Sequence, residues 1–350
     1  MKHFNFPSKC LKYYRDILDK KRIKKYDVGD SQKRDFTLVS TRNYEVACIE
    51  LFEEVFKEKM SKEFWSWKYA QHGMKWRGVC AVKGGKVVGH YNGIGRNILY
   101  FGQHKKAIAS GDTMVSPKAR GGIKQNSPFY TMVKIWVEMN LGYNQEFLLS
   151  FGFPNKRVMA LSKAVGLYAE VDTITEIHWQ TTQVNSADTN VEKYLDHVKT
   201  DAEILTVWRN MAGDFKDALI GVRNIAYLKH RYINHPKFEY KIYLVYSSEK
   251  NLQGVFVLKQ ENKVALLMDV ITQKENFSLI VSEALKKAHK NKSDTMKCWI
   301  TTSKAKFLDC HSATLNKIDV AIPTSNFTPG FDPETIRNKW FLMYGDTDFI

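Results

Sequence analysis

The chain has little of what stabilises secreted proteins or anchors membrane proteins. Only 5 of its 350 residues are cysteine, an odd number without any C-x-x-C pair, which argues against a zinc site and a disulfide framework. No apolar run reaches the roughly 18 residues of a membrane-spanning helix. The first residues, MKHFNFPSKC, lack the apolar stretch of a secretory signal. We therefore expect a reduced, cytoplasmic protein.

Acidic residues are too few to balance the basic ones. The chain has 53 Lys and Arg against 37 Asp and Glu, a formal net charge of +16. Such a charge is typical of a lysine-rich surface, and it would also attract coenzyme A, a phosphate-bearing acceptor, tRNA or an anionic membrane face. The charge alone does not choose among these. The length and the 44% hydrophobic content predict a large core and two domains.

The most informative stretch is ASGDTMVSPKARGG, residues 109–122. It predicts a strand that ends at Val115, then a glycine loop, then a helix over Phe129–Met139. A strand, a glycine loop and a helix N-terminus together present free backbone N–H groups to a phosphate. A second stretch, FGFPNKRVMALSKAVGL at residues 151–167, predicts a turn with Asn155 as the cap of the next helix.

Together these stretches resemble the acyl-CoA-binding core of the Gcn5-related N-acetyltransferase (GNAT) superfamily. The segment FGFPN is similar to the "GFPN" motif of a two-domain subgroup, and WFLMYGDTD at residues 340–348 resembles that subgroup's ending. The chain departs from the family pattern at two places. The family loop would put glycines at Ile123 and Gln125, and Ser162 stands where many relatives carry a general-acid tyrosine.

The resemblance implies an α/β (mixed α+β) fold of two GNAT-like halves, each a mixed, mostly antiparallel twisted sheet flanked by helices. An internal repeat favours the same organisation, because WKYAQH at residues 67–72 aligns with HRYINH at residues 230–235. Each copy is followed by a strand, a polar turn and a strand that carries a glycine, Gly89 or Gly254.

We expect three regions. Residues 1–34 form a basic helical element, residues 35–180 a first domain with the acyl-CoA site, and residues 181–350 a degenerate second domain. The second copy has no glycine-rich loop after its strand at residues 264–270. It is therefore expected to lack a cofactor phosphate site.

The resemblance also implies acetyl-CoA or a related acyl-CoA as co-substrate, with no metal. Met114 and Val115 would pair with the pantetheine amides, as a strand does. The loop and the helix cap after it would bind the rest of the cofactor through Arg120, Gly121, Gly122, Ile123, Lys124, Gln125 and Asn155.

For the proton transfers, Asp112 is the candidate base, on the interpretation that its side chain faces the acceptor; the alternative is a strand-end Asp that binds backbone. Ser162 is a poor acid for a leaving thiolate, and Tyr168 can replace it. Asp346 and Asp348 are candidates for binding an amine or a sugar hydroxyl, or they form a surface turn.

The sequence thus predicts an acyl-CoA-dependent N-acetyltransferase. Its expected acceptor is an amino sugar or nucleotide-linked sugar of surface polysaccharide synthesis. One alternative is a Fem-type aminoacyl-tRNA-dependent transferase, the only interpretation with a nucleic-acid partner. Another is a catalytically inactive GNAT-derived binding module. The aromatic cluster FWSWKY, residues 64–69, is either core or a floor under the acceptor.

Overall fold

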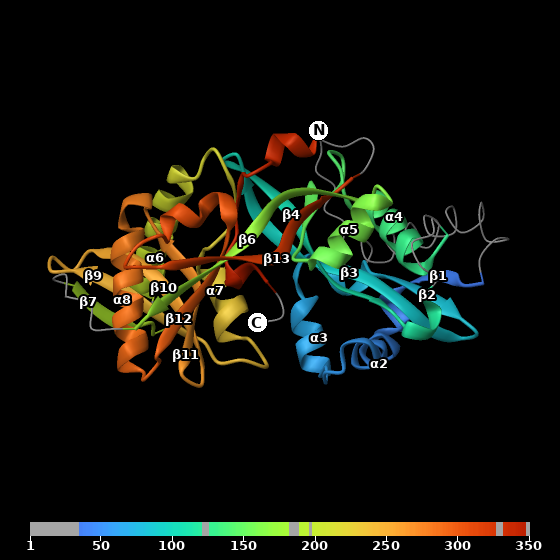
Figure 1. Cartoon of the computed structure of the whole chain (residues 1–350), viewed down its shortest axis with the longest axis horizontal. Helices are drawn as coiled ribbons and strands as arrows, with labels where there is room; N and C mark the ends of the chain where they lie inside the picture. The colour runs from blue at the N-terminus through green and yellow to red at the C-terminus, as the bar shows by residue number, and fades with distance from the viewer. Residues whose placement is uncertain (1–34, 121–125, 182–188, 196–197, 327–331, 348–350) are drawn as a thin grey trace, which may run out of the picture.

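The computed structural model describes residues 35–120, 126–181, 189–195, 198–326 and 332–347. The predicted basic element at residues 1–34 lies outside them. Figure 1 shows two halves side by side, each with its own sheet and helices. The predicted fold class, mixed α/β with two mixed sheets flanked by helices, is confirmed.

In chain order the first half contains β1 (Thr37–Ser40), η2 (Thr41–Asn43), α2 (Glu45–Phe56), α3 (Lys62–Lys68), η3 (Gln71–Trp76), β2 (Val79–Lys83), β3 (Lys86–Tyr100), β4 (Gln103–Val115), η4 (Pro117–Ala119), α4 (Pro128–Asn140), β5 (Leu149–Phe151), α5 (Lys156–Ala164) and β6 (Tyr168–Gln180). The predicted strand ends at Val115, and the predicted helix over Phe129–Met139 lies within α4.

The second half repeats much of that order. It contains β7 (Thr189–Lys193), α6 (Val198–Asp214), β8 (Leu219–Gly221), α7 (Ile225–Leu228), the π-helical turn η5 (Lys229–Ile233), β9 (Lys241–Ser247), β10 (Leu252–Glu261), β11 (Val264–Thr272), η6 (Lys274–Asn276), α8 (Phe277–Lys290), β12 (Thr295–Thr301), η7 (Thr302–Phe307), β13 (Thr314–Ser325), η8 (Pro333–Ile336), β14 (Trp340–Phe341) and η9 (Tyr344–Asp346).

Local chemistry explains the main boundaries. The hairpin between β2 and β3 turns at Gly84 and Gly85, which both have positive φ, as a type I′ turn requires. The Ser127 hydroxyl accepts from the Tyr130 N–H and caps α4, with Pro128 in its first turn. Ser40 caps the short η2, and α2 begins at Glu45.

At the junction, each half contributes strands to the sheet of the other half. The first sheet has the order β1-β2-β3-β4-β5 and also takes β8, which pairs with β3, and β14, which pairs with β8. The second sheet has the order β13-β6-β12-β11-β10-β9-β7, so β6 from the first half lies inside it. Figure 1 shows β6 and β13 running between the halves. The domain limits proposed from the sequence are therefore crossed by strands in both directions.

Packing supports the internal repeat. A Cβ on Gly89 of β3 would lie 2.7 Å from Met132 Cε of α4, and a Cβ on Gly254 of β10 would lie 2.5 Å from Ile280 Cδ1 of α8. In both halves a glycine thus lets a helix approach the sheet closely. None of the described helices is both long and apolar enough to span a bilayer.

Candidate functional site

The first sheet opens between β4 and β5. The parallel pairing runs only from Ala107↔Leu149 to Ala109↔Phe151, whereas β4 continues to Val115. Within this extension the register with β3 shifts, and Asp112 takes a left-handed φ of 47°. Beyond Ala109 the described strands leave this edge of β4 unpaired with β5. Such an edge can pair with an extended chain of amides.

Several residues predicted to bind the cofactor lie at this opening. Met114 is fully buried and Val115 is half-buried at the end of β4. Arg120 is exposed, and its Nε donates to the Val115 carbonyl at 3.1 Å, which holds the guanidinium at the strand end. Gly121, Gly122, Ile123, Lys124 and Gln125 lie outside the described residues.

Asn155 has a local role in this structure. Its Oδ1 accepts from the Val158 N–H at 3.0 Å, so the residue caps α5 as predicted. Its backbone also forms a bridge with Val320 of β13. The side chain orients α5 beside the opening, and its role as a cofactor ligand stays a prediction.

Asp112 does not face an open channel. Its side chain is only 5% exposed, pairs with Lys68 Nζ at 2.7 Å and accepts from the Tyr69 hydroxyl at 2.6 Å. Burial raises the pKa of this carboxyl, but Lys68 and Tyr69 outweigh burial and the net pKa is lowered. A buried, ion-paired carboxylate with a lowered pKa is a weak proton acceptor. The proposed base role is therefore not favoured by this geometry.

The second half contains the same contact. The Tyr232 hydroxyl donates to Asp269 Oδ2 at 3.0 Å, and in the repeat Tyr232 aligns with Tyr69. Asp269 lies on β11 in the position that Asp112 has on β4, counted from the first pair of each parallel ladder. Because both halves contain an Asp–Tyr hydrogen bond, we interpret this contact as structural: it holds a helical segment against a strand.

The two candidate acids lie in different surroundings. Ser162 is fully buried in α5, and its Oγ has no hydrogen-bond partner among the described residues. Tyr168, at the start of β6, shares a hydrogen bond of 2.5 Å with the Tyr91 hydroxyl, which also donates to Ser110 Oγ at 3.3 Å. Burial raises the pKa of both phenols, so they stay protonated at neutral pH. Ser110 comes directly after Ala109, so this hydroxyl chain ends where β4 and β5 separate.

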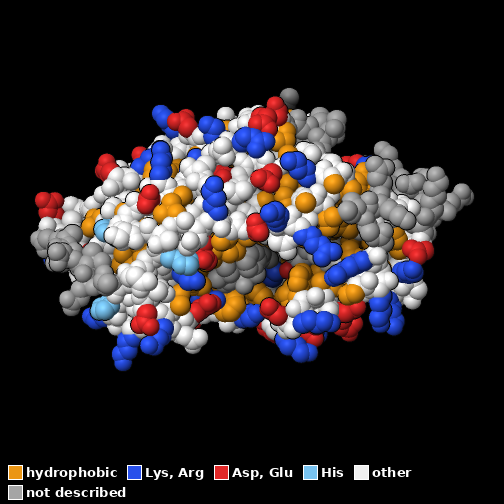
Figure 2. All heavy atoms as spheres, viewed as in Figure 1, with side chains coloured by type: hydrophobic (Ala, Val, Ile, Leu, Met, Phe, Trp, Pro, Cys, Tyr) orange, Lys and Arg blue, Asp and Glu red, His pale blue; other side chains and the backbone are white. Residues whose placement is uncertain are grey.

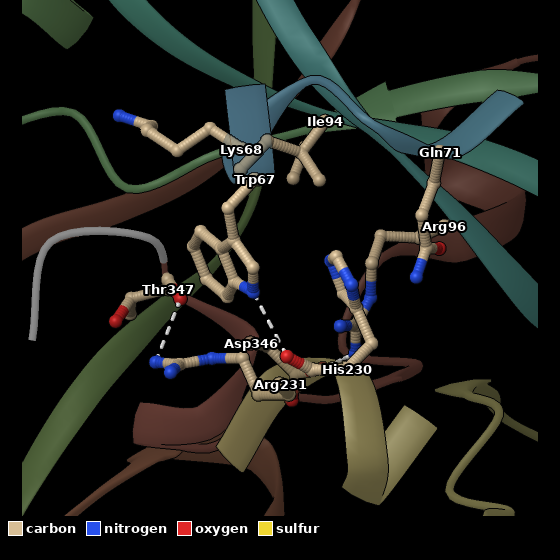
Figure 3. A pocket seen from close by; sticks show the side chains of 10 residues that line it. Trp67, Lys68, Gln71, Ile94, Arg96, His230, Arg231, Asp346 and Thr347 are labelled. Atoms are coloured by element: carbon tan, nitrogen blue, oxygen red, sulfur yellow. Dashed lines mark hydrogen bonds and ion pairs between the residues drawn. The ribbon is translucent and has the colours of Figure 1, made fainter. Parts of the chain in front are cut away.

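A pocket lies between the two halves, and Ala109 is one of its lining residues. The first half lines it with Trp67, Lys68, Gln71, Ile94, Arg96 and Ala109, and the second half lines it with His230, Arg231, Asp346 and Thr347. Figure 2 shows a hollow near the middle of the molecule, and Figure 3 shows the lining side chains. The pocket is partly open and its volume is about 30 Å³, larger than the roughly 10–15 Å³ that one water molecule needs by the same measure. The pocket therefore accommodates a small head group.

The repeated segments meet directly at this pocket. Trp67 Nε1 donates to the His230 carbonyl at 2.9 Å, and the two residues are 163 positions apart. Their rings are stacked, with centroids 5.1 Å apart and planes 12° apart. Burial, together with the charges of Arg96 and Arg231, lowers the pKa of His230 to about 4. His230 is therefore a neutral imidazole at physiological pH.

Asp346 lines the pocket, but its oxygens are already engaged. Oδ1 accepts from Arg96 Nη2 at 2.8 Å, and Oδ2 accepts from Arg223 Nη2 at 2.6 Å and from the Met343 N–H at 2.9 Å. The carboxylate positions Arg96 and has little capacity left for an amine. Asp348 lies outside the described residues.

The sequence analysis did not identify Arg96, His230 or Arg231 as site residues. The alignment of residues 67–72 with residues 230–235 contained the signal, because it marked Trp67 and His230 as equivalent. It did not show that the two copies face one another. The described residues contain no cluster of three or more His, Cys, Asp or Glu side chains that could hold a metal ion.

No protein-family model and no curated protein matches the chain. Solved structures do. A conserved protein of unknown function from Enterococcus faecalis V583, a probable N-acyltransferase, superposes with a TM-score of 0.64 at 10% identity, over 83% of this chain and 72% of that one. A GCN5-related N-acetyltransferase from Anabaena variabilis gives 0.61 at 15% identity, over 82% and 72%.

N-myristoyltransferase from Saccharomyces cerevisiae, solved with bound myristoyl-CoA, gives a TM-score of 0.56 at 11% identity, over 87% of this chain and 86% of that one. At such identities the similarity establishes the fold. The predicted GNAT-like fold is confirmed, and membership of the two-domain subgroup with the GFPN motif stays a prediction.

Proposed function

We propose that the chain is an acyl-CoA-dependent N-acyltransferase that takes its acyl donor in the opening between β4 and β5 and its acceptor amine in the pocket between the halves. One observation carries this proposal. Ala109 is the last residue of β4 that pairs with β5, and it is also a wall of the pocket. A thioester in the opening and an amine in the pocket would therefore meet at one residue.

Acyl transfer from the thioester needs a neutral amine as the nucleophile. The amine nitrogen attacks the thioester carbonyl, the C–N bond forms, and the C–S bond breaks. The nitrogen loses one proton, and the coenzyme A thiolate gains one, which leaves an amide and the free thiol. Tyr168 is proposed to supply the thiolate proton through Tyr91 and Ser110, and backbone N–H groups at the end of β4 to stabilise the oxyanion.

The finer parts of the proposal rest on the sequence resemblance. We propose an acetyl donor and an amino-sugar or nucleotide-sugar acceptor. The names of the structural neighbours, two N-acyl- or N-acetyltransferases and an N-myristoyltransferase, support amide formation from a thioester in general. A cytoplasmic location belongs to the same proposal.

A substitution at the junction tests this arrangement. In the matching register position of the second half, Leu266 stands where the first half has Ala109. We expect Ala109→Leu to fill the pocket end and to lower kcat/KM for the amine by about 10²-fold or more, since a misplaced nucleophile loses much of the effect of proximity. Coenzyme A affinity, measured by calorimetry, should change by less than about threefold, since most of coenzyme A would lie along the unpaired edge of β4 beyond Ala109.

The same measurements separate the alternatives. Wild-type protein that binds neither coenzyme A nor acetyl-CoA contradicts the proposal, and binding of aminoacyl-tRNA instead would favour the Fem-type alternative. Binding of acetyl-CoA without release of free thiol in the presence of a broad panel of primary amines would favour the inactive module.

A further inference from the structure

The pocket between the halves contains an arginine whose donors are only partly used. The Arg96 side chain is 12% exposed, and its Nη2 donates to Asp346 Oδ1 at 2.8 Å. The guanidinium also lies over the Tyr227 ring, 4.4 Å from the centroid. Its Nε and Nη1 have no hydrogen-bond partner in the part of the chain that the structure describes. Asp346 thus fixes one end of the guanidinium, and the N–H groups of two nitrogens, Nε and Nη1, stay available beside the pocket.

His230 lies next to this arginine. Figure 3 shows both side chains projecting into the same part of the pocket from opposite halves of the molecule. The His230 ring stacks on Trp67, and the His230 ring nitrogens make no hydrogen bond with described residues. The lowered pKa of His230, caused by burial and then by Arg96 and Arg231, indicates a positive potential at this point.

From this arrangement we infer that the acceptor carries an anionic group, a carboxylate or a phosphate, close to its amine: Arg96 binds the anion and His230 accepts a hydrogen bond from the amine. The inference rests on the proposed function and narrows its substrate class. A guanidinium presents paired donors that fit carboxylate and phosphate oxygens.

The same charges would assist the reaction. A positive potential disfavours a bound ammonium, so it lowers the pKa of the acceptor amine and increases the neutral fraction that can attack. The site then has less need of a strong carboxylate base, which agrees with the engagement of Asp112 and Asp346 in ion pairs. An anion on the acceptor would offset the cost of bringing the amine near Arg96.

Matched acceptors test the inference with acetyl-CoA as donor. Glycine against glycinamide tests a carboxylate, and 2-aminoethyl phosphate against ethanolamine tests a phosphate. We expect the anionic member of at least one pair to have a kcat/KM at least about 10-fold higher, as a charge-assisted hydrogen bond would give. Arg96→Gln should remove that preference, and Arg96→Lys should retain part of it. Unchanged coenzyme A affinity and a single cooperative thermal transition would show that both variants remain folded.

A binding measurement makes the test independent of turnover. Titration of the full-length protein with acetate or inorganic phosphate at neutral pH should shift the His230 ring resonances saturably, and His230→Gln assigns those resonances. The shift should vanish in Arg96→Gln. If neither anion shifts the wild-type resonances, or if both shift them equally in Arg96→Gln, the inference is overturned. Failure of acetyl-CoA to bind would instead overturn the proposed function.

Discussion

In the first half β4 separates from β5 after Ala109, and residues 116–127 then lead to α4; in the second half β11 pairs with β12 only as far as Leu266, and residues 273–276 lead to α8. The two sheets thus open at matching positions. The connections beyond the two openings differ, because the second half has a much shorter segment between its strand and its helix.

The second opening is covered by the chain itself. Met343 forms a bridge with Ile300 of β12, and the Thr301 N–H donates to the Leu342 carbonyl at 3.1 Å. Gly345 lies so close to β11 that an added Cβ would be 2.9 Å from Asp269 Oδ2. The C-terminal residues 342–346 therefore pack against both strands where they separate. Residues of the chain itself therefore fill the opening in the second sheet, whereas no described strand pairs with the corresponding edge of β4 in the first.

The strongest test of this comparison is the paired substitution Asp112→Asn and Asp269→Asn. Asp112→Asn removes a negative partner of the buried Lys68 and should lower the free energy of unfolding by about 3–5 kcal/mol. Asp269→Asn should lower it by about 1–3 kcal/mol, because Arg223 keeps its ion pair with Asp346. If both carboxylates are anchors, turnover per folded Asp112→Asn molecule should stay within a few fold of wild type. Urea unfolding and kcat at saturating acceptor measure the two effects.

The general-base hypothesis makes a different prediction for the first half alone. It requires kcat to fall by about 10²–10⁴-fold in Asp112→Asn, with coenzyme A affinity little changed. If kcat falls by that much in folded Asp112→Asn protein, Asp112 acts as the general base and its role differs from that of Asp269.

A second comparison uses the cations that come after β4 and β11. Arg120→Ala should weaken coenzyme A binding by about 1.5–3 kcal/mol if its guanidinium contacts phosphate. Lys274→Ala is the matched control, because Lys274 comes after β11 and its Nζ binds the Asp214 carbonyl. Calorimetry should show wild-type coenzyme A affinity for Lys274→Ala. Equal losses in the two variants would argue against a cofactor site in the first half only.

The covering of the second opening is tested by Gly345→Ala. An added Cβ would lie 2.0 Å from the Tyr232 hydroxyl oxygen, so overpacking should destabilise the fold by about 1–3 kcal/mol. The control is Gly213→Ala in α6, where no atom lies within 4 Å of the added Cβ and helix propensity predicts a gain of up to about 1 kcal/mol. Thermal unfolding should move in opposite directions for the two variants.

The smallest expected effect concerns the matched histidines His72 and His235. Burial, then the positive charges of Arg231, Lys259 and His230 if protonated, lowers the pKa of His235 to about 3. The pKa of His72 is also lowered by burial, but there Glu146 opposes the shift. His235 should therefore contribute more to the pH dependence of stability.

The sign of this dependence is set by proton binding. Between about pH 6.5 and the folded pKa the unfolded chain binds more protons at these histidines, so stability falls as pH decreases through this range. His235→Asn, whose amide oxygen can replace Nδ1 as acceptor for two backbone N–H groups, should remove on the order of 1–2 kcal/mol of this loss between about pH 6.5 and 4. His72→Asn should remove less. Equal slopes in urea unfolding against pH would contradict the expected difference.

The sequence by itself determined the elements that local chemistry controls. The segment at residues 109–115 marked the end of β4, the residues after the loop marked α4, and Asn155 marked the start of α5. These features depend on neighbours within a few residues. The repeat of residues 67–72 at residues 230–235 could also be read from the sequence, because equivalent residues keep equivalent positions in a duplicated fold.

Only the tertiary structure decided what those residues do. Asp112 looked like a channel-facing acid, but a register shift in β4 and the approach of α3 turn it into a buried ion-pair partner. Asp346 binds arginines that lie far from it in the sequence. Arg96 and His230 become neighbours because β8 pairs with β3, the strand of Arg96, and leads through α7 into η5, which contains His230. Side-chain environment is a long-range property, since the partners that set burial and charge come from distant segments.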